Sequence, residues 1–228
     1  MELIRTEDLE KTYQDHTIPV YALRGVTFSV GSGEFLAIAG PSGSGKTTLL
    51  NLIGALDRPS SGNIYIENHS LRDLDKKSLS ALRLNRIGFI FQAYNLIPVL
   101  TALENIEFKL MLLGVPTKER RERALRLMGE LGIAGLADKR PNEMSGGQQQ
   151  RVAVARAIVN LPQIVLADEP TANLDSVTAH ALLDLMLAMN EERGITFVFS
   201  SHDRQVLEHA KRVVILHDGQ IVEDNGKR

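Results

Sequence analysis

The first third of the chain carries short apolar stretches of the kind found in β-strands. Residues 21–30 alternate between apolar and polar side chains, which predicts a strand with one buried face. Residues 34–40 form an apolar run that ends in glycine, which predicts a strand buried on both faces. Residues 62–68 and 87–91 predict two more short strands, and leucine and isoleucine at helical spacing predict a helix over 45–56.

The middle of the chain, from about residue 93 to residue 160, has a different pattern. Apolar residues recur at the helical period over 100–115 and 118–133, with charged residues on the opposite face. This segment is therefore predicted to be mostly helical.

The strand pattern resumes toward the C-terminus. Residues 163–168 and 195–201 predict buried strands that flank a helix over 176–194, and residues 212–224 predict a hairpin. Strands that alternate with helices indicate an α/β fold around a buried, mostly parallel sheet. We interpret the helical middle as an insertion into that α/β core.

Composition narrows the class of protein. A chain of 228 residues with 43% hydrophobic and 24% charged residues is typical of one soluble globular domain. The net charge of −2 argues against a nucleic-acid-binding protein, and no nucleic-acid partner is expected. The lack of cysteine excludes disulfides, thiolate metal sites and a cysteine nucleophile. No apolar run reaches the roughly 18 residues that span a membrane, so work at a membrane would need another chain to cross it.

A phosphate-binding loop follows the first buried strand. Residues 40–48 match the pattern G-x-x-x-x-G-K-[ST] and lie between a predicted strand and a predicted helix. Glycines let the backbone close around a phosphate, Lys46 supplies a charge for the β- and γ-phosphates, and the Thr47 hydroxyl can ligate Mg²⁺. The candidate nucleotide-binding residues are Gly40, Pro41, Ser42, Gly43, Ser44, Gly45, Lys46, Thr47 and Thr48.

Two carboxylates follow a second buried strand. Asp168 and Glu169 come directly after the apolar run that starts near residue 163. Ligands of open α/β sheets bind at the carboxyl edge of such strands. We therefore expect Asp168 to hold Mg²⁺ through water and Glu169 to polarise an attacking water as a general base.

A second candidate anion site lies within residues 141–151. Ser145, Gly146 and Gly147 stand just ahead of an apolar run, which predicts the N-terminus of a helix. The exposed N–H groups and the dipole of a helix N-terminus favour a phosphate. The sequence thus predicts two phosphate-binding segments in one chain.

As a set, these motifs resemble the nucleotide-binding ATPase subunit of ABC transporters over essentially the whole chain. The phosphate loop is similar to the family's Walker A motif, the run ending in Asp168 and Glu169 to Walker B, and residues 144–148 to the LSGGQ signature. Tyr13 stands where the family has an aromatic residue that stacks on adenine, and Gln92 matches its Q-loop. Residues 173–175 match its D-loop, and His202 matches its H-loop.

The resemblance implies a P-loop NTPase fold of the ABC type, in a single domain over residues 1–228. Residues 1–92 and 161–228 would form a RecA-like core with a mostly parallel sheet and an N-terminal antiparallel β subdomain. Residues from about 93 to 160 would form the inserted α-helical subdomain.

The resemblance also implies a head-to-tail homodimer that sandwiches two ATP molecules, with Mg²⁺ as cofactor. The implied catalytic residues are Lys46, Gln92, Glu169 and His202, and the implied metal-binding residues are Thr47, Gln92 and Asp168. The residues expected to contact the ATP bound by the second copy are Ser145, Gly146, Gly147 and Gln148. Tyr13 is expected to stack on adenine; the alternative is an ordinary exposed tyrosine.

Two positions depart from the family pattern. Met144 replaces the usual leucine, a swap of similar volume that we expect to be tolerated. Ser200 and Ser201 precede His202, where the family usually has an apolar residue and a threonine. Neither departure removes a catalytic group, so ATP hydrolysis is still expected.

The segments between the motifs resemble the branch of lipoprotein-releasing, macrolide-export and cell-division ATPases, although Ala172 stands where that branch usually has glycine. This implies an integral membrane permease partner of the FtsX/MacB type. We expect a separate cytoplasmic subunit, peripheral on the inner face of the cell membrane. The loop of about 93–103, with apolar Tyr94, Leu96, Ile97 and Pro98, is expected to face that partner; the alternative is that it is buried.

Three functions stay open at this point. The favoured one is an ATPase subunit that drives lipoprotein release or export. The second is an ATPase that regulates a periplasmic enzyme through its membrane partner without transport. The third is a soluble ABC protein of DNA repair or translation, but the sequence lacks the coiled-coil or zinc insertion, basic face or tandem cassettes that this function would need.

Overall fold

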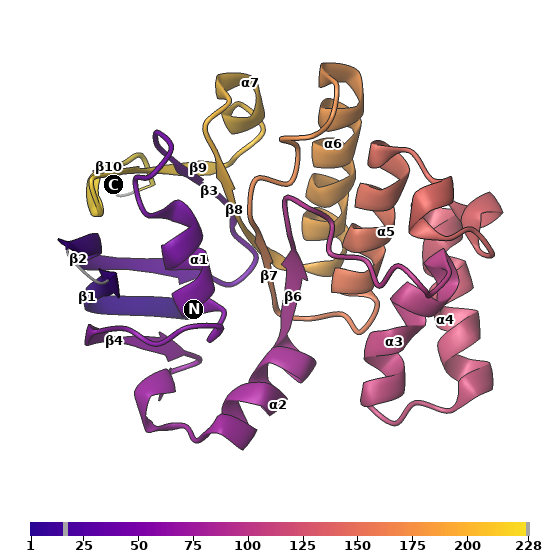
Figure 1. Ribbon diagram of the computed structural model, residues 1–228, viewed down its shortest axis with the longest axis horizontal. Coiled ribbons are helices and arrows are strands. Elements are labelled where there is room, and N and C mark those ends of the chain that lie inside the picture. The colour runs from indigo at the N-terminus through magenta and orange to yellow at the C-terminus, as the bar shows by residue number, and fades with distance from the viewer. Residues whose placement is uncertain (16–17, 227–228) are drawn as a thin grey trace.

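The computed structural model describes residues 1–15 and 18–226 as two β-sheets with helices around them (Figure 1). A four-stranded antiparallel sheet has the strand order β2-β1-β4-β5, and a six-stranded, mostly parallel sheet has the order β10-β9-β3-β8-β7-β6. The predicted α/β class, with a mostly parallel core sheet and a separate antiparallel sheet, is confirmed.

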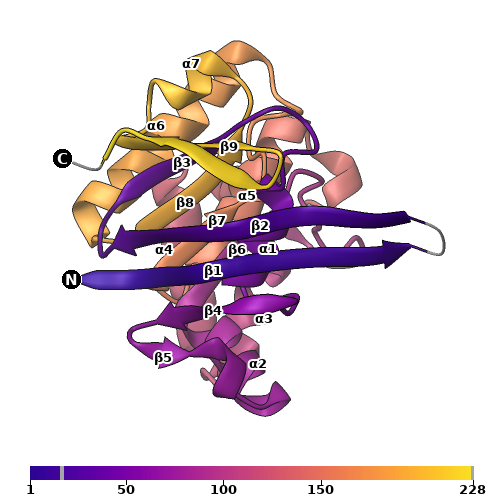
Figure 2. The same ribbon diagram turned by 90° about the vertical axis from the view of Figure 1, so that its left-hand side faces the viewer.

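The antiparallel sheet is built from the N-terminal part of the chain. Its strands are β1 (Glu2–Asp15), β2 (Ile18–Gly31), β4 (Ser61–Ile66) and β5 (His69–Ser70). Figure 2 shows β1 and β2 as a long two-stranded ribbon along one side of the molecule. The apolar pattern does not reveal β1, because its pairing with β2 shifts register at four places and each shift interrupts the alternation.

The six-stranded sheet supplies the frame for the site. Its strands are β3 (Phe35–Ala39), β6 (Ile87–Ile90), β7 (Ile164–Ala167), β8 (Thr196–Ser201), β9 (Arg212–His217) and β10 (Gln220–Asp224). Every residue of β3, β7 and β8 is buried, as their continuous apolar runs predict. Since β3, β6, β7 and β8 are parallel, the segments that follow them meet at one edge of the sheet.

Four helices accompany this core: α1 (Lys46–Ile53), α2 (Lys76–Arg86), α6 (Ser176–Arg193) and α7 (Arg204–Leu207). The sequence pattern misses α2, because this short helix is mostly polar: Leu79 is its only buried residue, and Leu82 is partly buried against the same core. Its start is fixed instead by Asp75, whose carboxylate accepts a hydrogen bond from the backbone N–H of Ser78.

The helices of the middle segment pack on one another at one side of the molecule (Figure 1). They are α3 (Ala102–Leu112), α4 (Thr117–Glu130) and α5 (Gly146–Ile158). Short 3₁₀ turns cover Leu71–Asp73, Ala134–Leu136 and Pro141–Glu143. The limits 93 and 160 of a separate helical subdomain stay a prediction.

Apolar layers cover both faces of the six-stranded sheet. Alternate residues of β3 point to opposite sides: Phe35 and Ala37 join the core shared with the middle helices, whereas Leu36 and Ile38 join the core beneath α1 and the antiparallel sheet. The Phe35 ring lies 5.6 Å and 5.1 Å, centroid to centroid, from two phenylalanines of β8. The sheet edge is thereby held rigidly between two layers.

None of the helices in the described ranges 1–15 and 18–226 combines the length and the hydropathy needed to cross a bilayer.

Candidate functional site

The loop between β3 and α1 wraps closely on itself. Its glycines take backbone conformations that favour glycine, with φ of 80° at Gly43 and 105° at Gly45. Gly45 caps α1 without any side-chain hydrogen bond, so the first N–H groups of the helix face the loop. The buried Ser44 hydroxyl also has no hydrogen-bond partner within the described part of the chain. Free N–H groups and an orphaned hydroxyl suit a phosphate.

The tightness of this loop predicts unequal costs for two similar substitutions. A methyl group added at Gly40 would lie 2.1 Å from the backbone oxygen of Leu216, whereas one added at Gly43 would meet nothing within 4 Å. We expect Gly40→Ala to lower the free energy of unfolding by about 3 kcal/mol, and Gly43→Ala to lower it by about 1 kcal/mol through backbone strain alone. Urea unfolding of both variants without nucleotide measures the difference. Equal losses would contradict the close approach at Gly40.

Lys46 holds a positive charge inside the loop. Its Nζ donates hydrogen bonds to the backbone oxygens of Gly40 (2.8 Å) and Pro41 (3.0 Å) and lies 3.8 Å from Oε1 of Glu169. The residue is only 6% exposed. A buried ammonium whose hydrogen bonds go only to backbone carbonyl groups suits a polyphosphate, because the ligand would bring negative charge next to it.

Thr47 and Asp168 come together from segments far apart in the sequence. The Thr47 hydroxyl lies 2.9 Å and 3.0 Å from the two carboxylate oxygens of Asp168, which follows β7. A hydroxyl and one carboxylate beside a phosphate loop are the hard oxygen ligands that Mg²⁺ uses. No cluster of three or more histidine, aspartate or glutamate side chains within residues 1–15 and 18–226 forms a metal cage. The donor set therefore fits an Mg²⁺ ion held together with substrate phosphates, and the assignment of Thr47 and Asp168 to this metal stays a prediction.

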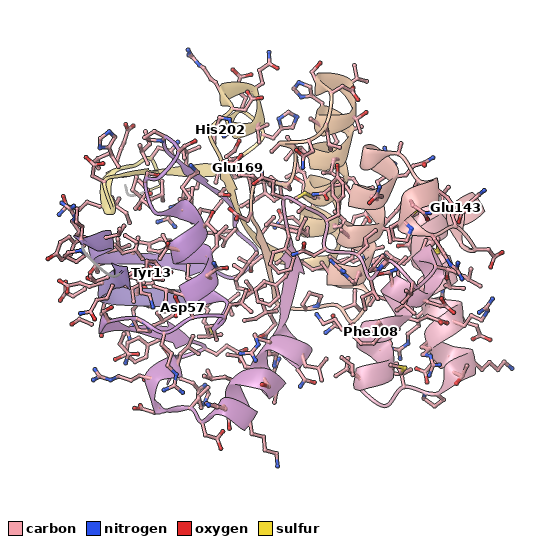
Figure 3. The ribbon with its side chains drawn as sticks, in the orientation of Figure 1. Tyr13, Asp57, Phe108, Glu143, Glu169 and His202 are labelled. Carbon is pink, nitrogen blue, oxygen red and sulfur yellow. The ribbon has the colours of Figure 1, made fainter. Side chains whose placement is uncertain are left out.

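Glu169 and His202 face each other at the end of β7 and β8 (Figure 3). The His202 ring nitrogen Nδ1 lies 3.0 Å and 3.1 Å from the two carboxylate oxygens of Glu169, so an Nδ1–H donates to this carboxylate. The Glu169 side chain is 14% exposed and that of His202 is 59% exposed. The backbone of Glu169 is left-handed, with φ of 46°. The structure thus brings together the two side chains that the sequence places at neighbouring strand ends.

Gln92 follows β6 and is exposed at the same edge of the sheet. Its backbone oxygen accepts a hydrogen bond from the Asn173 side chain (2.9 Å), which joins the predicted Q-loop and D-loop. Within the described residues, no hydrogen bond links the Gln92 side chain to Thr47 or Asp168. Its predicted contact with the metal stays a prediction.

Tyr13 lies on β1 beside residues that the sequence analysis did not single out. Its hydroxyl donates to Oδ2 of Asp57 (2.9 Å), and the Lys11 ammonium lies 4.7 Å from the ring centroid. Burial and the Asp57 carboxylate raise the pKa of Tyr13. The side chain is also close enough to Thr48, at the start of α1, to exchange a hydrogen bond. Adenine stacking on Tyr13 stays a prediction. The contacts with Asp57 and Lys11 hold the ring in place near the phosphate-binding loop.

The signature segment begins α5 with a reciprocal cap. The Ser145 hydroxyl accepts from the Gln148 N–H (3.3 Å), and the Gln148 carboxamide oxygen accepts from the Ser145 N–H (2.9 Å). Both glycines beside it stand in confined positions: a methyl group at Gly146 would lie 2.8 Å from the Tyr94 hydroxyl, and one at Gly147 would lie 2.6 Å from the Thr178 side chain. The cap leaves the exposed end of α5 ordered and free of bulky side chains.

The signature segment does not join the phosphate loop of its own chain. Figure 3 places Glu143, just before the signature, well away from Glu169 and His202. No hydrogen bond or ion pair joins residues 144–148 to residues 40–48 in the described structure. The two predicted phosphate sites therefore remain separate within one chain.

A loop that binds phosphate between β3 and α1, with an acidic pair at the end of β7, defines a P-loop NTPase. The family model described as ABC transporter matches residues 23–172, and the chain belongs to that family. It is an ATPase of the ABC type, which binds and hydrolyses ATP. This confirms the family and the activity that the motifs predict.

Relatives and a solved structure extend this match to nearly the whole chain. The ABC transporter ATP-binding protein MJ0796 of Methanocaldococcus jannaschii is 46% identical over 224 residues, covering 96% of this chain and 95% of its own. A structure described as a dimeric post-hydrolysis state of MJ0796 bound to ADP and Pi has a TM-score of 0.91 at 43% identity, with 98% of each chain covered. The agreement confirms the ABC ATPase fold.

Two other relatives carry functional names. The lipoprotein-releasing system ATP-binding protein LolD of Legionella pneumophila is 41% identical, with 96% of each chain covered. The macrolide export ATP-binding/permease protein MacB of Syntrophobacter fumaroxidans is 44% identical over 99% of this chain. The chain spans only about a third of that relative, 32% of its length.

Proposed function

We propose that this chain is the ATPase subunit that dimerises on ATP and drives an integral membrane partner in lipoprotein release or export. The observation that carries the dimer is the separation of the signature segment from its own phosphate loop. A second copy placed head to tail would bring Ser145, Gly146, Gly147 and Gln148 to the nucleotide held by Lys46. The names of the LolD and MacB relatives support the process and a permease of the FtsX/MacB type.

Each candidate residue has a defined task in this proposal. The loop N–H groups and Lys46 bind and orient the phosphates, and Thr47 with Asp168 and Gln92 would hold Mg²⁺. When bound, Mg²⁺ neutralises charge on the phosphate oxygens. Glu169 takes the proton of the attacking water, and His202 keeps that carboxylate in place and reaches the γ-phosphate.

A groove between the two halves of the chain is the proposed docking face for the membrane partner. It is lined by apolar side chains from the turn after α1, from β6 and the loop that follows it, and from α3 and α5: Leu56, Ile87, Phe89, Phe91, Phe108, Leu112 and Ala157. Phe108 lies on the side of α3 that faces β6 (Figure 3). Leu56 and Leu112 are 47% and 55% exposed, which is unusual for leucines that have no partner.

The loop of 93–103 contributes less apolar surface than the sequence predicts. Leu96 packs against the helical core, and the backbone of Ile97 is bonded to the Asn105 side chain. Tyr94 lies against the signature glycine Gly146, whereas Pro98 and Val99 of the loop are exposed, Val99 at 72%. The docking surface therefore shifts from the loop itself to the groove beside it.

The groove also carries positive charge. Burial and the neighbouring Arg156 lower the pKa of Lys109 to about 8. Lys109 donates to the backbone oxygen of Ile87, and Arg156 donates to backbone oxygens of residues 94 and 95. The acceptors of both cations are neutral carbonyl groups, which do not cancel their positive charge. We therefore expect the docked segment of the partner to bring a carboxylate.

A charge placed in this groove should uncouple the chain from its partner. We expect Leu112→Glu to reduce recovery of the integral membrane protein at least about tenfold, because the carboxylate would be buried in an apolar contact. The purified variant should hydrolyse ATP at the parent rate. Affinity capture from detergent-solubilised membranes, followed by identification of the bound protein, measures this.

Val222→Glu is the matched control, since Val222 is 62% exposed on β10 and lies outside the groove. Equal capture by Leu112→Glu and the parent would contradict the docking face. Recovery of soluble or ribosomal proteins alone by the parent would contradict the membrane role. A captured permease of the cell-division type would favour the alternative, regulation of a periplasmic enzyme without transport.

A further inference from the structure

We propose that Ser200 is a positioning residue for ATP hydrolysis, which sets both the Asp168 carboxylate and the backbone of Glu169. This inference rests on the roles proposed above for these two acidic residues. Ser200 is one of the two positions in β8 at which the sequence departs from the family pattern, and an apolar residue is usual there. The structure gives that departure a specific task.

The Ser200 hydroxyl makes two hydrogen bonds in opposite directions. It donates to Oδ1 of Asp168 at 2.7 Å, and it accepts from the backbone N–H of Glu169 at 2.9 Å. Ser200 itself is fully buried, with 0% exposure. One hydroxyl therefore fixes two successive acidic residues from the neighbouring strand.

The bond to Asp168 completes a pair of hydroxyl donors around one carboxylate. Thr47 approaches that carboxylate from the phosphate loop, and Ser200 approaches it from β8. With a donor on each side the carboxylate cannot rotate freely, so its remaining lone pairs keep one direction. The direction of those lone pairs determines how well the Asp168 carboxylate can coordinate a cation beside Thr47, directly or through water.

The bond from Glu169 stabilises a strained backbone. A non-glycine residue with φ of 46° is less stable than in the extended or helical region, so other contacts must hold it there. The Ser200 hydroxyl is the acceptor for the N–H of this peptide. The left-handed turn is what carries the Glu169 side chain toward His202 and Lys46. Ser200 thus holds the general base in position through the main chain.

The test compares Ser200→Val with Ser200→Thr, which have the same shape and differ in a hydroxyl. We expect Ser200→Val to lower kcat for ATP hydrolysis by about 10- to 100-fold, the effect of losing a hydrogen bond to a charged group. KM for ATP should change less than about threefold, because the phosphate loop is untouched. Ser200→Thr should retain kcat within about threefold.

A second readout does not depend on turnover. Equilibrium binding of ATP to Ser200→Val should match the parent when EDTA is present, and should weaken by about tenfold relative to the parent when Mg²⁺ is present. Thr196→Val is the matched control, since Thr196 is a buried hydroxyl on the same strand that accepts the Gly33 N–H at 2.8 Å, far from the site. It should lose thermal stability and keep kcat.

Parent-like kcat in Ser200→Val, or equal loss in Ser200→Val and Ser200→Thr, would overturn the proposal. Loss of kcat in Thr196→Val to the same extent would also overturn it, because any buried hydroxyl of β8 would then suffice. Failure of the proposed function gives a different pattern, in which Glu169→Gln keeps full turnover whatever residue 200 is.

Discussion

We expect the Glu169→Gln variant to bind ATP but to hydrolyse it about 10²- to 10⁴-fold more slowly than the parent, the range for loss of a general base. An amide of nearly the same shape can fill the space beside His202 and Lys46, yet it cannot take a proton from water. The surroundings of residue 169, with His202 at 3.0 Å and Lys46 at 3.8 Å, should therefore stay as they are in the parent. Only the ability of the side chain to accept a proton changes.

Because hydrolysis is blocked, the variant should also accumulate as a dimer that depends on ATP. Phosphate release gives the rate, and size-exclusion chromatography with and without ATP gives the oligomeric state. Glu223→Gln on the exposed face of β10 is the control for the chemical change and should behave as the parent. Full turnover in Glu169→Gln would refute the assignment of the base.

The second large effect is expected from Ser145→Arg. We expect ATP affinity within about threefold of the parent, no ATP-dependent dimer and at least about 100-fold slower hydrolysis. An arginine would place a bulky cation at the N-terminus of α5, where N–H groups are proposed to meet the phosphate held by the second copy. Since this end of α5 lies apart from its own phosphate loop, binding to a single chain should survive.

Loss of the Ser145 cap alone costs stability, on the order of 1 kcal/mol, and must be separated from loss of the dimer. Asp75→Ala removes the cap of α2, whose carboxylate bonds the Ser78 N–H at 2.7 Å, and serves as the control. It should lose similar stability and still dimerise. Equal loss of ATP binding in Ser145→Arg would mean that the serine belongs to the site of its own chain.

The phosphate loop and the acidic pair could be predicted because their chemistry is local. Residues 40–48 and 168–169 each follow a buried apolar run, and the spacing alone places them at strand ends. His202 follows a buried strand as well, but its role could be predicted only through the resemblance to the ABC family, because a single histidine at a strand end carries no specific signal. Parallel strands then bring these segments to one edge without further information.

Contacts between distant segments could not be predicted in this way. The Ser200 hydroxyl can reach Asp168 and Glu169 because β8 pairs with β7. The local sequence does not indicate which strands pair. Asp57 gives no local signal of its contact with Tyr13. The helix α2 is mostly polar and fully buries only Leu79, and β1 is broken by bulges, so periodicity gives no clear signal for either.

Arg156 and Ser145 stand near opposite ends of the same helix. Arg156 donates hydrogen bonds to the backbone oxygens of residues 94 and 95, next to the proposed docking groove. Ser145 caps the other end of the helix, which would face the nucleotide bound by the second copy. A helix of 13 residues is about 20 Å long and stiff along its axis. In the proposed function, α5 would therefore transmit force from a docked membrane partner to the dimer contact, and the bond from Gln150 to the backbone oxygen of Pro170 would pass part of it to the segment that carries Glu169.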